Sequence, residues 1–270
     1  MKFAINTIIF KDRELEEVIP IIKNFGYDGV EIAWIPPEHP FYTGRDIDVP
    51  KLKKICSSVE LEVADICPFY PAEYDISNTS KAKRQKGLDY VKKIIDSANE
   101  LGAKTIVVVP SAVFTQPSGS FDEVWNCCVK SLRELGSYAE KNNITLAIEP
   151  ITRFLTHFVT RVDQAMKLVK DAGVSGLGVT ADVFHMNIEE KSIEEALKQA
   201  KDYLVHVHIS DSNNFAPGTG HLDFESIFRV LLDIDYNHFV SAELGVDMLE
   251  AGGAAKTTID YVKRLIEKIK

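Results

Sequence analysis

Four short apolar runs of this sequence each end in a side chain that commonly binds metal ions. The runs cover residues 144–149, 177–182, 203–208 and 239–243, and they end at Glu149, Asp182, His208 and Glu243. Short runs that are rich in β-branched and aliphatic residues indicate buried parallel strands. Because the C-terminal ends of the strands meet at one mouth in a barrel of parallel strands, we expect these four side chains to converge there.

The rest of the chain alternates such runs with longer segments of helical periodicity. Apolar residues recur at helical spacing over residues 15–25, and Gly26 then indicates a helix end. Further strands are expected at residues 1–10, 29–33, 61–66 and 105–109, and further helices near residues 81–101, 121–141, 162–170, 193–200, 224–232 and 254–269. Eight strand–helix units predict an α/β protein with a single (β/α)8 TIM barrel, one catalytic domain over residues 1–270.

The main alternative architecture is an open doubly wound sheet that binds a nucleotide. Such a sheet carries a glycine-rich first turn, whereas residues 6–11 contain no glycine. The sequence also contains no P-loop. Both observations favour the barrel.

Composition excludes several classes of function. The net charge of −9 argues against a nucleic-acid surface, which needs a basic face. The sequence has no apolar stretch long enough to span a bilayer, and its apolar start is read as a first strand rather than a signal peptide. Its four cysteines show no CxxC spacing, so we expect a reduced, cytoplasmic protein.

The ligand types restrict the metal. Glu149, Asp182 and Glu243 supply carboxylate oxygens, and His208 supplies one imidazole. This set suits one hard or borderline divalent cation, Mn²⁺ or Co²⁺ first and Mg²⁺ next, better than a structural zinc site. The sequence therefore predicts a single divalent metal ion at the barrel mouth.

The residues around these ligands resemble a known family. The relevant segments are residues 149–154, 182–190, 206–213, 217–221 and 241–243. They resemble the sugar isomerase/epimerase (xylose isomerase-like) TIM-barrel superfamily, and most of all its D-tagatose and D-allulose (psicose) 3-epimerases. The most specific piece is the string Asp-Val-Phe-His-Met-Asn-Ile-Glu-Glu that begins at Asp182.

This resemblance implies roles for individual residues. Glu149 and Glu243 are implied to serve both as metal ligands and as the catalytic acid and base, and Asp182 and His208 as the other ligands. His185 is implied to contact the substrate. Arg153 is expected to belong to the substrate-binding site, where it could orient a carboxylate, or else to hold its loop through backbone carbonyls. The resemblance further implies a small sugar substrate and a homo-oligomer, either a dimer or a tetramer.

The chemistry of a ketose 3-epimerase fits this set. The enzyme must remove a proton from a carbon next to a carbonyl and return one to the opposite face, and two carboxylates can share that task. A divalent ion can polarise the carbonyl and stabilise an enediolate. His185 would donate a hydrogen bond to the developing oxyanion.

Two positions depart from the epimerase pattern. Leu155 stands where the group has a second Glu, and Asn214 stands where it has an Arg. A related isomerase that acts on a phosphosugar, a fructosamine or an inositol-derived keto compound therefore stays open. An endonuclease IV-like repair nuclease is a remote alternative. It would need additional metal ligands and a basic DNA-binding face, whereas this chain has only seven His and is acidic. A non-catalytic sugar-binding barrel would not need the paired carboxylates.

Several other polar residues carry weaker signals. Glu31 is expected to line the pocket, with metal ligation as a less favoured role, and His206 is expected to support the site rather than bind the ion. Cys67 is expected to be buried, although it could face the substrate. The charged residues at 189–195 are expected to form a solvated helix start.

Overall fold

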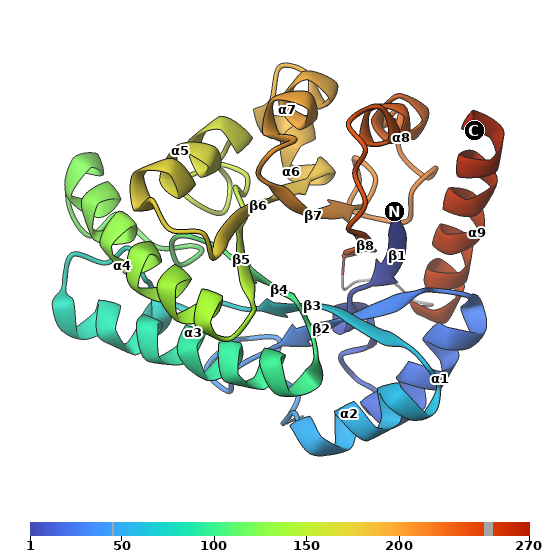
Figure 1. The fold of residues 1–270 in the computed structure, drawn as a ribbon, viewed down its shortest axis with the longest axis horizontal. Helices are drawn as coiled ribbons and strands as arrows, with labels where there is room; N and C mark the ends of the chain where they lie inside the picture. Colours follow the sequence, from blue (N-terminus) through green and yellow to red (C-terminus); the bar gives the residue numbers. More distant parts are fainter. Residues whose placement is uncertain (45, 246–250) are drawn as a thin grey trace.

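The computed structural model describes residues 1–44, 46–245 and 251–270. In this part of the chain, eight parallel strands form one sheet with helices around its outside (Figure 1). The strands are β1 Lys2–Ile5, β2 Gly29–Trp34, β3 Glu62–Pro68, β4 Thr105–Val108, β5 Thr145–Ile148, β6 Leu177–Asp182, β7 Leu204–Ile209 and β8 Phe239–Ala242. The α-helices are α1 Leu15–Phe25, α2 Val49–Ser58, α3 Lys81–Leu101, α4 Phe121–Lys141, α5 Val162–Ala172, α6 Val183–Glu189, α7 Ile193–Ala200, α8 Phe224–Asp233 and α9 Ala251–Ile269. Two short 3₁₀ helices, η1 Thr7–Phe10 and η2 Ala72–Tyr74, complete the set.

The sheet closes on itself. Its strand order is β1-β8-β7-β6-β5-β4-β3-β2, and β1 pairs in parallel with β8. A parallel bridge between Asn6 and Glu31 then joins the β1 end of the sheet to β2. The predicted (β/α)8 barrel is confirmed, and the C-terminal ends of its strands meet at one mouth.

Local signals set most helix ends. Gly26 ends α1 and Gly102 ends α3, and both adopt the left-handed conformation, with φ angles of 91° and 84°. Glycine reaches these angles without steric cost. At the start of α4, Ser120 and Glu123 form a capping box in which each side chain accepts from the other residue's backbone N–H. As a result, α3 and α4 have the bounds predicted from the sequence.

The sequence prediction differs from the structure at the N-terminus and at two short helices. The strand expected over residues 1–10 ends at Ile5, because the side chain of Asn6 accepts a hydrogen bond from the Ile8 N–H (2.9 Å) and starts η1. Helices α2 and α6 were not predicted. Each begins at an aspartate cap, Asp48 and Asp182 respectively, whose carboxylate accepts backbone N–H groups of the first turn.

The barrel separates an apolar outer layer from a polar interior. Along β2, Glu31 contacts other strands inside the barrel, whereas its neighbours Val30 and Ile32 face the opposite side and are fully buried. Helix α1 covers this region with Val18, Ile19 and Ile22, none of which is exposed. No helix in the described ranges has the length and apolarity that crossing a bilayer would require.

Candidate metal centre and active site

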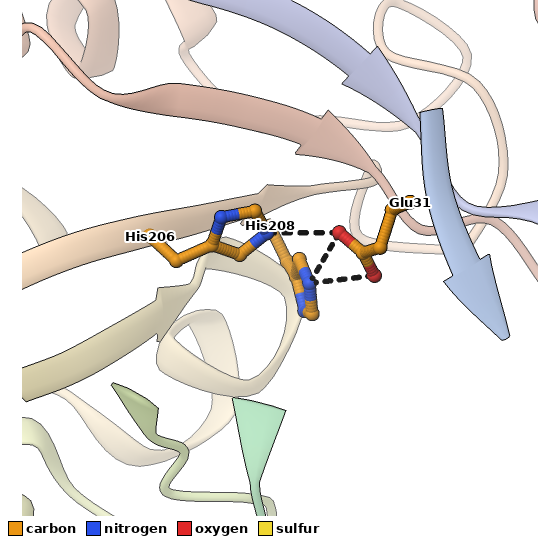
Figure 2. Close-up of side chains that lie close together, drawn as sticks. All are labelled: Glu31, His206 and His208. Atoms are coloured by element: carbon orange, nitrogen blue, oxygen red, sulfur yellow. Dashed lines mark hydrogen bonds and ion pairs between the residues drawn. The ribbon is translucent and has the colours of Figure 1, made fainter. Parts of the chain in front are cut away.

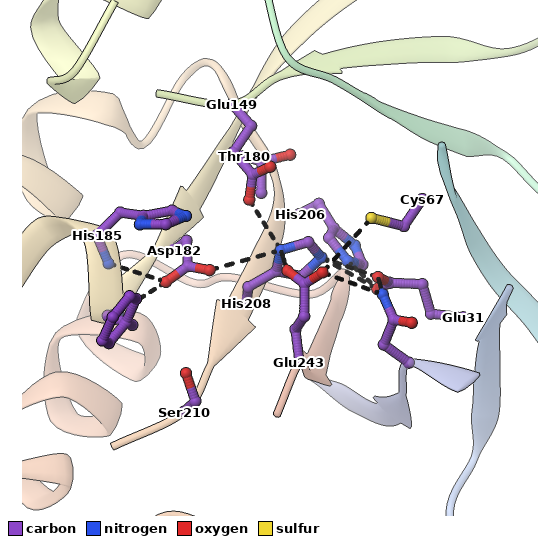
Figure 3. A network of polar contacts seen from close by, with 12 residues as sticks. Glu31, Cys67, Glu149, Thr180, Asp182, His185, His206, His208, Ser210 and Glu243 are labelled. Carbon is purple, nitrogen blue, oxygen red and sulfur yellow. Dashed lines mark hydrogen bonds and ion pairs between the residues drawn. The ribbon is translucent and has the colours of Figure 1, made fainter. Parts of the chain in front are cut away.

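Four neighbouring strands carry the predicted metal ligands to the barrel mouth (Figure 3). Glu149 directly follows β5, Asp182 is the last residue of β6, His208 lies on β7, and Glu243 directly follows β8. Strand register places Asp182 beside His208. The backbone N–H of Glu149 donates to Val108 and that of Glu243 donates to Ile209, so both glutamates remain anchored to neighbouring strands.

The four side chains meet around one ring nitrogen. Nδ1 of His208 lies 2.9 Å from a carboxylate oxygen of Glu149, 2.9 Å from one of Glu243 and 3.8 Å from one of Asp182. One ligand atom from each of the four residues lies within 4.8 Å of the other three. The structure thus brings the predicted ligand set together in an arrangement that is able to bind a metal ion.

The electrostatics of this cluster fit a bound cation. Burial raises the pKa of Glu149 above its ordinary value. Burial alone would lower the pKa of His208, but the charges of Glu31, Glu243 and Glu149 outweigh it and hold that pKa well above the ordinary value. Within the described residues, the ion pairs of these carboxylates are made with histidine only. Because buried carboxylates need compensating positive charge, the donor set fits a divalent metal ion.

A second layer of polar contacts lies beneath the cluster (Figure 2). Glu31 is fully buried, and its carboxylate lies 3.1 Å from Nε2 of His208 and 2.8 Å from Nε2 of His206. Burial would raise the pKa of Glu31, but His208 and His206 outweigh it and lower that pKa. The Asn6 amide donates to the same carboxylate. Glu31 therefore orients His208, a role that the sequence analysis missed, although a lone carboxylate inside an apolar run was a signal for it.

A cavity of about 480 Å³ lies above the ligands. Glu149, Asp182 and Glu243 face it, and His185 also lines it. Nδ1 of His185 is buried without a hydrogen-bond partner among the described residues, so it is available to a bound molecule. Three further residues singled out in the sequence line the same cavity, namely Cys67, Leu155 and Asn214.

Arg153 lies elsewhere. It is not among the described residues that line the cavity, and its guanidinium donates to both carboxylate oxygens of Glu189, at 2.9 and 2.8 Å. The Arg153 backbone N–H donates to the same carboxylate (2.7 Å). The Glu189 side chain is only 2% exposed, so this residue is not part of a solvated helix start as the sequence analysis expected. Glu190 also differs from that expectation, because its carboxylate accepts the Val162 N–H at the start of α5.

The fold and the site together define a TIM-barrel protein with a candidate divalent metal centre at the C-terminal mouth. Comparison with known proteins agrees with this class. The pattern of the xylose isomerase-like TIM barrel family matches residues 19–265, and the chain belongs to that family.

Individual relatives support the same class. The D-psicose 3-epimerase of Agrobacterium fabrum is 35% identical over 227 residues, which cover 82% of this chain and 76% of that protein. The 3-dehydro-D-guloside 4-epimerase of Escherichia coli is 28% identical over 254 residues, covering 90% and 92%. A solved structure of an L-ribulose 3-epimerase superposes with a TM-score of 0.90 at 23% identity, covers 99% of this chain and 95% of that chain, and shows the shared fold.

These relatives are epimerases, which are enzymes of the isomerase class. The resemblance and the enzyme class predicted from the sequence are therefore confirmed.

Proposed function

We propose that this protein is a metal-dependent epimerase that inverts a carbon next to the carbonyl of a keto-sugar, with C3 of a ketose as the first candidate. One observation carries the proposal. Glu149 and Glu243 approach His208 from two sides at the same distance, 2.9 Å, and both face the cavity (Figure 3). Two carboxylates placed in this way can act on opposite faces of one carbon.

The metal would be held by Glu149, Asp182, Nδ1 of His208 and Glu243. Three carboxylates with one imidazole favour Mn²⁺ or Co²⁺, with Mg²⁺ as the next choice. When bound there, the ion supplies positive charge that polarises the substrate carbonyl and stabilises the enediolate.

The protein's own groups perform the proton transfers. One glutamate removes the proton from the carbon next to the carbonyl, and the other delivers a proton to the opposite face. In the reverse reaction, the two exchange roles. In the tautomer that carries a proton on Nδ1, His185 donates a hydrogen bond to a substrate oxygen and stabilises charge that develops on it.

A second candidate is inversion of C4 next to a C3 carbonyl. The Escherichia coli relative is named as a 4-epimerase of a 3-dehydro-guloside and matches 90% of this chain. Both reactions exchange a proton next to a carbonyl, so the same two glutamates would serve either one. Phosphosugar isomerisation has less support, because no Lys or Arg lines the described part of the cavity.

The test is proton exchange in heavy water. Protein loaded with Mn²⁺ or Co²⁺ is incubated in D₂O with ketoses, 3-keto glycosides, ketose phosphates and fructosamines, and NMR locates deuterium in the substrate. We expect deuterium only at a carbon next to the carbonyl, together with formation of the epimer. Absence of exchange in every keto-sugar, with the ion shown at the four ligands by anomalous diffraction, would contradict the proposal.

A further inference from the structure

The cavity has a polar floor and apolar walls. The charged residues that line its described part are the carboxylates Glu149, Asp182 and Glu243, all at the metal centre. Above them, aliphatic side chains form much of the wall, namely Ile8, Val109, Val113, Ile151, Leu155 and Leu244. A phosphate or carboxylate group on the substrate would find no cationic partner among these residues.

The polar groups of the wall are already largely engaged by the protein. The Tyr70 hydroxyl donates to the Val107 carbonyl (3.0 Å). The Asn213 amide donates to the Thr219 carbonyl (3.2 Å) and accepts from the Phe215 N–H (3.1 Å). The side-chain oxygen of Asn214 accepts from the Ser210 hydroxyl (3.0 Å). Hydroxyl groups on a long polyol tail would therefore lose water and gain few hydrogen bonds, which is unfavourable.

Three phenylalanines line the cavity and remain open to solvent. Phe41, Phe114 and Phe215 follow β2, β4 and β7 in the chain, and they are 38%, 80% and 39% exposed. They make up three of the five large apolar side chains that are exposed in the described ranges. Solvent-exposed aromatic groups gathered at one concave site mark a binding surface for an apolar group.

The backbone of Phe114 adopts a sterically unfavourable conformation. Its φ angle is 55°, in the left-handed region that residues other than glycine rarely adopt. The Phe114 N–H donates to the backbone carbonyl of Leu155 (2.9 Å), and Leu155 also lines the cavity. Unusual backbone angles of this kind persist where the surrounding structure fixes them, often at ligand sites.

We propose that the substrate of this site is a keto-sugar that carries an apolar substituent, such as an aryl or alkyl aglycone, and that this substituent packs on Phe41, Phe114 and Phe215. The sugar carbonyl and its neighbouring hydroxyl lie at the carboxylate floor, and the aglycone replaces the hydroxyls or phosphate that these walls cannot satisfy. This inference rests on the proposed epimerase function and narrows its substrate class.

The test compares two keto-glycosides that differ only in the substituent, with a free ketose as a third compound. Phenyl and methyl 3-keto-β-D-glucopyranoside and free D-fructose are assayed by deuterium incorporation next to the carbonyl, with Mn²⁺-loaded protein. We expect kcat/KM for the phenyl compound to exceed that for the methyl compound by about tenfold or more, the gain that burial of a phenyl ring provides. D-Fructose is expected to be the poorest of the three.

Two variants locate the effect on the aromatic wall. Phe114→Asn removes the ring and keeps a residue that tolerates the left-handed angle, and Phe215→Ser provides a second removal. Each should lower kcat/KM for the phenyl compound about three- to tenfold and change that for the methyl compound less than about twofold. Phe154→Ser is the matched control, because Phe154 is 74% exposed but is not among the cavity-lining residues.

The possible results distinguish failure of the apolar-substituent inference from failure of the proposed epimerase function. Equal rates for phenyl and methyl compounds, or a preference for D-fructose, would overturn the apolar-substituent inference and leave the epimerase proposal standing. The inference would also be overturned if Phe114→Asn or Phe215→Ser dissociated from a dimer into monomers while its ratio of phenyl to methyl rates stayed unchanged. The rings would then contact a second copy of the chain instead of the substrate. No exchange with any of the three compounds, nor with the wider set of keto-sugars, would instead count against the epimerase function.

Discussion

Nε2 of His208 lies 3.1 Å from the buried carboxylate of Glu31, and this contact determines which ring nitrogen faces the carboxylates of Glu149 and Glu243. With the Nε2 proton directed at Glu31, Nδ1 is the ring nitrogen that faces Glu149 and Glu243, and it would give its lone pair to an ion bound there in place of the proton (Figure 2 and Figure 3). A carboxylate behind a histidine ligand fixes its tautomer and increases its basicity. Glu31 therefore prepares the metal centre without being one of the four ligands assigned to it.

Replacing Glu31 should weaken metal binding. Glu31→Gln keeps the size of the side chain but removes the charge behind His208. We expect the dissociation constant for Mn²⁺ or Co²⁺, measured by isothermal titration calorimetry, to rise about 10- to 100-fold. Glu62→Gln is the control, because Glu62, at the start of β3, forms an exposed ion pair with Lys2 of β1. Unchanged affinity in Glu31→Gln would show that the tautomer of His208 is set in another way.

Asp182 has two roles that substitution can separate. One carboxylate oxygen accepts the N–H groups of Phe184 (2.7 Å) and His185 (3.1 Å) at the start of α6, and the other faces His208. Asparagine also caps helices well, whereas alanine does not. With metal ions removed by EDTA, we expect the free energy of unfolding of Asp182→Ala to be about 1 kcal/mol lower than that of Asp182→Asn.

Both Asp182 variants should lose metal affinity by similar factors, because each lacks the carboxylate charge. Denaturant unfolding and calorimetry measure the two effects independently. Equal stability of the two variants would contradict the capping role, and full metal affinity in Asp182→Asn would contradict the assignment of Asp182 as a ligand.

The Arg153–Glu189 pair should affect stability more than catalysis. Hydrogen bonds from Arg153 hold the pKa of Glu189 below its ordinary value. The stabilisation is therefore complete above the unfolded-state pKa, about 4.3, and it is lost as the pH falls through the lower pKa of the folded state. At pH 7, we expect Glu189→Gln to lower the free energy of unfolding by about 1–2 kcal/mol.

Denaturant titrations across pH test this assignment. The difference between the wild type and Glu189→Gln should shrink as the pH falls below about 4.3. Glu195→Gln, which breaks an exposed pair with Lys198, serves as the control and should change stability little. If Arg153→Ala raises KM strongly but leaves the melting temperature unchanged, Arg153 contacts the substrate, as the sequence analysis proposed.

Most of the barrel could be predicted from the sequence because its signals are local. Gly102 and the capping box at Ser120 mark helix ends without reference to the rest of the fold. Helix α6 was missed because it has only seven residues, too few to show a clear period. Its one strong signal, Asp182 as a helix cap, was interpreted only as a metal ligand.

The metal ligands could be predicted from the sequence because they lie at strand ends. The contacts that cross the interior of the closed barrel could not. Glu149, Asp182, His208 and Glu243 lie on consecutive strands, so their convergence follows from parallel pairing alone. Glu31 meets His208 across the barrel interior, since β2 and β7 are not neighbours in the sheet. The carboxylate of Glu31 inside an apolar run indicates a buried polar contact, but its partner depends on the closed barrel and cannot be identified from the local sequence.

The proposed reaction requires the carboxylates of both Glu149 and Glu243. Glu149→Gln and Glu243→Gln should each lower epimerisation by about 10²- to 10⁴-fold, the usual loss when a positioned acid or base is removed. Both substitutions keep the size of the side chain and an oxygen that can face a metal ion, so both variants should fold. Circular dichroism and metal titration check this, with Glu62→Gln as a variant that should keep normal turnover.

Deuterium exchange in these two variants can assign each glutamate to a face of the substrate. If one glutamate removes the proton from a given epimer, the variant that retains it should still exchange that proton in D₂O without forming the other epimer. The opposite variant should exchange only the second epimer. His185→Ala should be milder than either variant, because it removes one hydrogen-bond donor and none of the four ligands. Near-normal turnover in either glutamine variant would rule out a two-carboxylate mechanism, even with a metal ion bound at the four ligands.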